Sequence, residues 1–228
     1  MIIKQSTAIN SPEETQVVSS PDKKAAENMS NLGNVNTRLY LINSIQEGDR
    51  MRHFIIIHGE ISTPHDYTKL LFTLDTASEN DVIDIYLRTP GGYVDGCADI
   101  ATAMELCKAK VTTHAMGITA SCGAILFDAG DESIPEAWSD ILYHMPIQII
   151  GGKSLDIRDI TTCEIIRGKY LLNKAVQKGH LTEEEYIKAT QGRQDVVVTG
   201  MEMRKRIAAK AAADAAPAAN NESEGDKK

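Results

Sequence analysis

The sequence has little that suits a membrane or an oxidising compartment. No apolar run approaches the roughly 20 residues that a helix needs to cross a bilayer, and the first residues contain no long apolar stretch typical of secretory leaders. There are only four cysteines, none in a CxxC pair, and they lie in apolar segments where free thiols behave as small hydrophobes: Cys97, Cys107, Cys122 and Cys163. We therefore expect a cytoplasmic protein with reduced cysteines.

The sequence also offers little to a nucleic acid or a metal ion. Its 24 basic residues against 32 acidic residues give a net charge of −8, which repels phosphate backbones. The one dense basic run, 204–206, is short enough to be a solvated helix face. No HExxH motif or paired His/Cys spacing is present, so we expect neither a metal site nor nucleic-acid binding.

The length of 228 residues suits one globular domain with terminal extensions. Residues 1–35 are rich in Ser, Asn, Lys and Glu, a composition that predicts a flexible arm. Residues 207–228 run Ala-rich and then polar, which predicts a frayed helix followed by a loose tail. The predicted globular domain therefore covers 36–206.

Short β-rich runs alternate with helical patterns in this domain, which predicts an α/β fold with a largely parallel sheet. The expected strands are 53–57, 83–87, 111–115 and 140–143. The expected helices are 63–77, 95–108, one beginning at Ser121, and 154–178. The last is unusually long for a small domain, so we expect it to project and pack against another subunit; the alternative is a bent core helix.

The segment GITASCGAIL, residues 117–126, lies where a predicted strand gives way to a helix. A serine there stands beside unpaired backbone N–H groups and the positive end of the helix dipole, which can stabilise an oxyanion on a bound acyl group. Ser121 is thus a candidate nucleophile. Taken alone, a serine after a strand is better explained as a helix N-cap.

Three further segments carry groups that acyl transfer needs. Gly91 and Gly92 follow the strand 83–87, where a glycine pair can expose a backbone N–H, so Gly92 and the N–H of Cys122 make a candidate oxyanion hole. His144 follows the strand 140–143 and is the candidate general base. Asp195 begins an apolar run and is the candidate carboxylate that orients the base.

Rival histidines are less favourably placed. His114 is predicted to lie inside a strand, and the remaining four fall on early strand, helix-start or loop positions without an evident serine partner: His53, His58, His65 and His180. A Ser–Lys peptidase is a further alternative, although no lysine is placed as well as His144.

Together these segments resemble the ClpP family, the proteolytic subunits of the ATP-dependent Clp protease, over roughly residues 53–203. The segment 117–124 is similar to that family's G-x-x-A-S-x-G-A nucleophile motif, and TPGG at 89–92 to its S-P-G-G oxyanion loop. The run HMP at 144–146 resembles its H-Q-P motif, and DVVVT at 195–199 its late D-x-x-x-S/T motif. The four motifs agree with the family in order and spacing.

The resemblance implies the ClpP/crotonase type of α/β fold, a spiral of ββα units with a projecting handle helix at 154–178. Handles of this family join two heptameric rings around a chamber fed by an AAA+ unfoldase, and the peptidase itself needs no cofactor. The substrate would be an unfolded polypeptide lying as an added strand. The residues expected to bind it are Gly91, Tyr93, Val94, Pro146, Ile147 and Ile149.

The sequence departs from the family at several points. Met145 replaces the usual Gln, the segment before residue 53 does not match the axial loop, and an Ala-rich extension follows residue 199. Three alternatives therefore stay open: a crotonase-type acyl-CoA enzyme using a similar oxyanion hole, a catalytically inactive ring-forming subunit, and a phage head-maturation protease.

Overall fold

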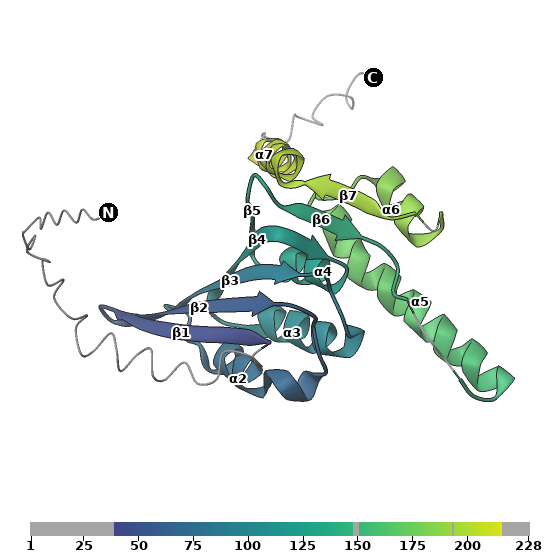
Figure 1. Cartoon of the computed structure of the whole chain (residues 1–228). Coiled ribbons are helices and arrows are strands. Elements are labelled where there is room, and N and C mark those ends of the chain that lie inside the picture. Colours follow the sequence, from purple (N-terminus) through teal and green to yellow (C-terminus); the bar gives the residue numbers. More distant parts are fainter. Residues whose placement is uncertain (1–38, 148–150, 193, 216–228) are drawn as a thin grey trace, which may run out of the picture. The chain divides into compact units, whose positions relative to one another are not determined.

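The computed structural model describes residues 39–147, 151–192 and 194–215. The predicted arm, 1–35, lies outside the described residues, as does the polar end of the predicted tail. Within the described ranges the chain forms one seven-stranded sheet with six α-helices, so the predicted α/β class is confirmed (Figure 1).

The strands run in the order β1-β2-β3-β4-β6-β7, with β5 also paired to β4. Their bounds are β1 Tyr40–Glu47, β2 Arg50–His58, β3 Val82–Thr89, β4 Lys110–Ala120, β5 Glu132–Pro135, β6 Asp140–Tyr143 and β7 Val196–Thr199. The pairs from β2 through β6 are parallel, whereas β1 and β7 pair antiparallel at the two ends of the order. The largely parallel sheet was thus predicted correctly.

Helices α2, α3 and α4 lie against one face of this sheet (Figure 1). The bounds of the six α-helices are α2 Thr68–Thr76, α3 Val94–Leu106, α4 Cys122–Ala129, α5 Ser154–Gln177, α6 Glu183–Thr190 and α7 Gly200–Ala215. The core fills the space between the two layers with fully buried aliphatic side chains such as Ile55, Ile85, Leu87, Leu74 and Leu126. Burial of this kind is the main stabilising term for the fold.

The helix predicted over 63–77 differs from the expectation in its first turn. Residues Pro64–Tyr67 form a 3₁₀ turn before α2 begins. The N–H of Asp66 donates to the carbonyl of Thr63 at 3.1 Å, which is the i to i+3 bond of that geometry. The hydroxyls of Ser62 and Thr63 both donate to the Asp66 carboxylate and hold the turn together.

Helix α5 leaves the body of the domain with its N-terminal half (Figure 1). Its buried residues, Gly168, Leu172 and Ala175, all lie in the C-terminal half, and large apolar side chains such as Leu155 and Ile166 are exposed. The projecting helix was therefore predicted correctly, and the bent core helix is not what forms. None of the described helices is both long and apolar enough to span a bilayer.

Candidate active site

The three predicted triad residues lie at the ends of three neighbouring strands. Ala120 of β4 pairs with Leu142 of β6, and Tyr143 of β6 pairs with Val196 of β7. Ser121 follows the first of these strands and His144 the second. Asp195 precedes the third strand, which is antiparallel to its neighbour, so all three residues emerge at the same edge of the sheet. The pairing of β4, β6 and β7 therefore brings this sequence-distant set to one region.

Ser121 has an unusual backbone conformation. Its φ of 57° and ψ of −120° make it the one non-glycine residue with positive φ in the described ranges. Its N–H donates to the carbonyl of Leu142 at 2.8 Å, and its own carbonyl accepts the first bonds of α4 from Ala124 and Ile125. A non-glycine residue held in this backbone conformation is strained, and such strain is concentrated at functional sites.

The Gly91–Gly92 loop lies directly against Ser121. A Cβ atom added to Gly91 would lie 2.6 Å from the Cβ of Ser121 and 3.1 Å from its Oγ. Thr89, which is buried, holds the loop by accepting from the N–H of Gly91 at 3.0 Å. Only glycine at position 91 leaves room for the serine side chain.

The peptide group between Gly91 and Gly92 has a defined orientation. Its carbonyl accepts from the N–H of Ile61 at 2.7 Å, and the N–H of Tyr93 returns a bond to the Ile61 carbonyl at 2.8 Å. Since the N–H of a trans peptide points away from its carbonyl, the N–H of Gly92 is directed away from Ile61. Among the hydrogen bonds of the described residues, none uses this N–H, which leaves it available to a ligand.

Cys122 begins α4, so its backbone N–H is one of the unpaired donors of a helix N-terminus. Its thiol donates to the carbonyl of Gly92 at 3.2 Å, and the thiol of Cys97 on α3 donates to the carbonyl of Cys122 at 3.4 Å. The contact with Cys97 lowers the pKa of the Cys122 thiol, whereas the same contact and burial raise the pKa of Cys97. The two predicted oxyanion donors thus belong to directly linked residues.

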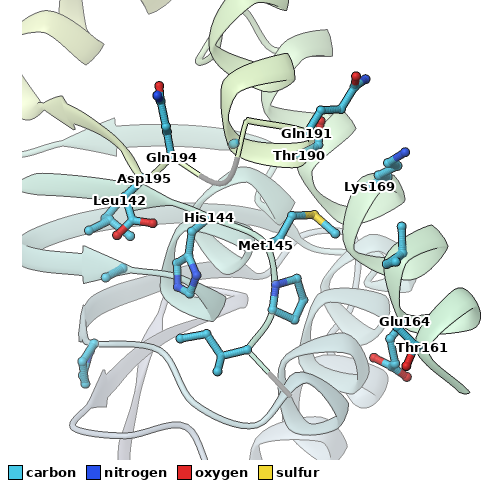
Figure 2. A pocket seen from close by; sticks show the side chains of 16 residues that line it. Leu142, His144, Met145, Thr161, Glu164, Lys169, Thr190, Gln191, Gln194 and Asp195 are labelled. Atoms are coloured by element: carbon cyan, nitrogen blue, oxygen red, sulfur yellow. The ribbon is translucent and has the colours of Figure 1, made fainter. Parts of the chain in front are cut away.

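His144 and Asp195 line the same pocket, which has a volume of 930 Å³ (Figure 2). The pocket also contacts Ala120 and Pro90, the neighbours of Ser121 and Gly91, but Ser121 itself is not among its lining residues. No hydrogen bond between described residues joins Ser121 to His144 or His144 to Asp195. The structure therefore gathers the set at one edge without closing it into a hydrogen-bonded chain.

The residues predicted to bind substrate lie around the same edge. Pro146 and Ile147 line the pocket, and Ile147 is 84% exposed. Tyr93 and Val94 follow the glycine loop, and Tyr93 is 61% exposed. Ile149 lies outside the described residues.

Sequence reasoning missed the far wall of the pocket, which α5, the end of α6 and the loop after α6 supply (Figure 2). Residues from these parts that line it include Thr161, Glu164, Lys169, Thr190, Gln191 and Gln194. Met145 packs onto α5 as well, because a Cβ added to Gly168 would lie 2.9 Å from its Cε. No local pattern signals these contacts; a glycine in the middle of a long helix was the only hint.

Three histidines outside the candidate triad contact other polar side chains. His114 lies 3.1 Å from Asp84 and stacks on Tyr86, and buried His180 lies 2.6 Å from Asp128. The expectation that His53 lacks a serine partner was wrong, because its Nδ1 lies 2.8 Å from the hydroxyl of Ser44. That pair is on the β1–β2 hairpin, and neighbouring strands rather than sequence proximity create it. Over the described ranges no group of three or more His, Cys, Asp or Glu side chains could hold a metal ion.

The fold and the site at the edge of its sheet define a class of protein. It is an α/β protein in which a strained serine lies between a strand and a helix and packs against a glycine loop. Comparison with protein families narrows this class, since the family model described as Clp protease matches residues 44–205. This match covers more than half of the chain, so the chain belongs to the Clp protease family.

Individual relatives carry the same name. The chain is similar to an ATP-dependent Clp protease proteolytic subunit of Borreliella afzelii, at 37% identity over 52% of this chain and 61% of that protein. It is similar to chloroplastic subunit 3 of Arabidopsis thaliana at 32% identity over 46% of this chain and 34% of that protein. With subunit 1 of Bacillus cereus it shares 29% identity over 66% of this chain and 85% of that protein. The first two matches thus span less than two thirds of the relatives' length.

Proposed function

We propose that the chain is a serine-type endopeptidase that hydrolyses peptide bonds of unfolded polypeptides. The observation that carries the proposal is the strained Ser121 at the β4–α4 junction, packed against Gly91 while β6 and β7 bring His144 and Asp195 to the same edge. The family match and the names of the relatives support a peptidase over an acyl-CoA enzyme.

In the proposed reaction Ser121 Oγ attacks the peptide carbonyl, and His144 takes the hydroxyl proton. The N–H groups of Gly92 and Cys122 donate to the oxyanion that forms. The C–N bond then breaks, and His144 returns the proton to the leaving amine. Water next attacks the acyl-serine with His144 again as base, which releases the new carboxylate and restores Ser121. Asp195 holds the tautomer of His144 throughout.

The lack of a hydrogen bond between Ser121 and His144, both described residues, is consistent with a site that closes on substrate. Catalytic hydrogen bonds are often long before substrate binds and tighten in the complex. An extended polypeptide lying between residues 92–94 and 146–147 would complete the edge from both sides. Ile149 belongs to the same proposed binding segment.

We further propose that the peptidase works as a homo-oligomer of stacked rings, joined through α5 and fed by an AAA+ unfoldase. The exposed apolar side chains of α5 support such packing, and the relatives are named as subunits of an ATP-dependent protease. All four cysteines are free thiols, which suits the reducing cytoplasm.

The test is the variant Ser121→Ala, assayed for hydrolysis of unfolded casein and for labelling by a fluorophosphonate. We expect both to fall to background, because the nucleophile is lost, while particle mass is unchanged. Ser44→Ala is the matched control: it removes the other serine that lies beside a histidine and should keep full activity. Undiminished hydrolysis in Ser121→Ala, or its loss in Ser44→Ala alone, would overturn the assignment.

A second candidate function is an inactive, ring-forming subunit. The absence of a hydrogen bond from His144 to either Ser121 or Asp195, all three of them described residues, favours it. This alternative predicts particles that assemble yet neither cleave casein nor react with a fluorophosphonate, with or without an unfoldase. Labelling of Ser121 in the wild-type particle excludes it.

A further inference from the structure

One buried carboxylate has no part in the proposed reaction. Asp128 lies in the last turn of α4, where every residue is buried and most are apolar, and it is 1% exposed. Its Oδ2 is the one buried side-chain nitrogen or oxygen in the described ranges without a hydrogen-bond partner. A buried carboxylate with an unsatisfied oxygen costs stability, so its presence calls for a role.

The other oxygen of Asp128 is shared by two buried side chains. The hydroxyl of Tyr143 donates to Oδ1 at 3.1 Å, and Nδ1 of His180 lies 2.6 Å from the same atom. Tyr143 is fully buried and His180 is 2% exposed. Burial and the neighbouring Asp128 raise the pKa of Tyr143 well above its usual range, so this hydroxyl remains a donor.

The three residues belong to the elements that carry the proposed catalytic groups. Asp128 lies about two turns along α4 from Ser121. Tyr143 is the last residue of β6 and directly precedes His144. His180 follows α5 and is fixed in turn by Arg206 of α7, whose Nη1 donates to its carbonyl at 2.8 Å. One carboxylate oxygen therefore joins the helix of the nucleophile to the strand of the base.

We propose that Asp128, Tyr143 and His180 form a buried bridge that positions His144 relative to Ser121. All three are positioning residues and touch neither substrate nor reacting atoms. This inference rests on the proposed function, because it assigns a purpose to the bridge only if Ser121 and His144 react together.

Backbone hydrogen bonds alone hold His144 less firmly relative to Ser121 than the bridge does. The N–H of Ser121 is bonded to Leu142, two residues before the base, and no described hydrogen bond holds the His144 ring itself. Tyr143 is the nearest side chain along the chain that is anchored to α4. Displacement of a catalytic group by about 1 Å can reduce the rate by up to about 100-fold, so this anchor has a measurable consequence.

Tyr143→Phe tests the bridge, because it removes one hydroxyl and leaves the ring. Thr113→Val is the matched control: the Thr113 hydroxyl is also buried and donates to α4, to the carbonyl of Phe127 at 2.7 Å, but from β4 rather than β6. We expect both variants to assemble and to melt at similarly lowered temperatures. Only Tyr143→Phe should lower kcat, by about 10-fold, with KM changed less than 2-fold and the labelling of Ser121 slowed in parallel.

Asp128→Asn provides the second variant. It preserves shape and one oxygen that can accept from Tyr143, so we expect kcat to fall less than in Tyr143→Phe, by about 3-fold. Asp128→Ala removes the acceptor and should match or exceed the loss in Tyr143→Phe. Equal kcat values in Tyr143→Phe and Thr113→Val would overturn the bridge. Loss of hydrolysis in Ser121→Ala, measured in the same assay, would leave the proposed function standing even if the bridge failed. Hydrolysis by Ser121→Ala would instead overturn the proposed function, and the bridge with it.

Discussion

Position 92 shows how one residue can be required by its backbone alone. Gly92 has a φ of 150°, and a Cβ added there would lie 2.1 Å from the carbonyl oxygen of Ile61 and 2.6 Å from its nitrogen. Both of those atoms are fixed by hydrogen bonds to the same loop. Any side chain at 92 must therefore displace the loop from Ile61 and change the direction of the Gly92 N–H.

We accordingly expect Gly92→Ala to lower kcat for peptide hydrolysis by about 100-fold or more, the loss measured when one oxyanion donor is removed. Gly48→Ala is the control, since Gly48 has a similarly glycine-like φ of 67° but nothing within 4 Å of an added Cβ. It should destabilise the hairpin slightly and leave kcat unchanged. Steady-state kinetics on both variants, each checked by melting temperature, decides the matter; wild-type kcat in Gly92→Ala would contradict the role of the loop.

At the scale of single residues, the sequence indicated which residues are candidates for the site but not which side chains they contact. Ser121, Gly92 and His144 stand out because a local pattern, strand then small residue or histidine, repeats at each of them. Asp128 does not stand out, because an acid in an apolar helix has no local partner. The residues that contact its Oδ1 lie 15 and 52 positions away and become visible only in three dimensions.

Short elements depend on tertiary pairing more than on their own sequence. The strands β1 and β5 were not predicted, since β1 contains no fully buried residue and β5 has only four residues. Both exist because a longer strand offers them hydrogen bonds, β2 for the first and β4 for the second. The long strands and the long helix α5 carry enough apolar periodicity to be recognised without a partner.

The helices α6 and α7 are tied by an ion pair whose strength should depend on pH. Arg206 donates to both carboxylate oxygens of Glu185, at 2.7 and 2.9 Å, and this interaction lowers the pKa of Glu185. A lowered folded-state pKa means that the stabilisation is present above the unfolded pKa of about 4.3 and is lost as pH falls through the folded value.

We expect Glu185→Gln to reduce the free energy of unfolding by about 1 kcal/mol at pH 7, and the difference from wild type to shrink as the pH falls from about 5 to about 3. Glutamine keeps the capping box with Thr182, so the change leaves the helix cap intact while it removes the charge and one of the two oxygens that accept from Arg206. Glu184→Gln, which breaks the more exposed pair with Lys188, should cost less than about 0.5 kcal/mol. Denaturant titrations across this pH range would contradict us if the two variants behaved alike.

At the scale of the whole molecule, α5 exposes apolar area that no other described residue covers. Its exposed large apolar side chains are Leu155, Ile160, Ile165, Ile166 and Tyr170. A monomer seldom keeps such a surface, which favours burial against other copies of the chain.

We expect Ile166→Glu to give a particle of lower mass than wild type in light scattering, because the charge would have to be buried where α5 packs. Ile166→Val keeps the apolar character and should assemble normally. Peptidase activity should fall together with the particle mass if ring assembly stabilises the sheet edge that carries Ser121, His144 and Asp195. A wild-type mass for Ile166→Glu would show that α5 does not join the copies at this point.

The order of the strands along the chain also determines when the candidate site can form during synthesis. The edge needs β4, β6 and β7, and β7 begins at Val196, close to the end of the domain. A chain still emerging from the ribosome can pair β4 with β6 but has no Asp195 beside His144, and α7 does not yet hold His180. On the proposed function, a nascent subunit therefore gains its peptidase activity only after β7 has been synthesised and has paired with β6.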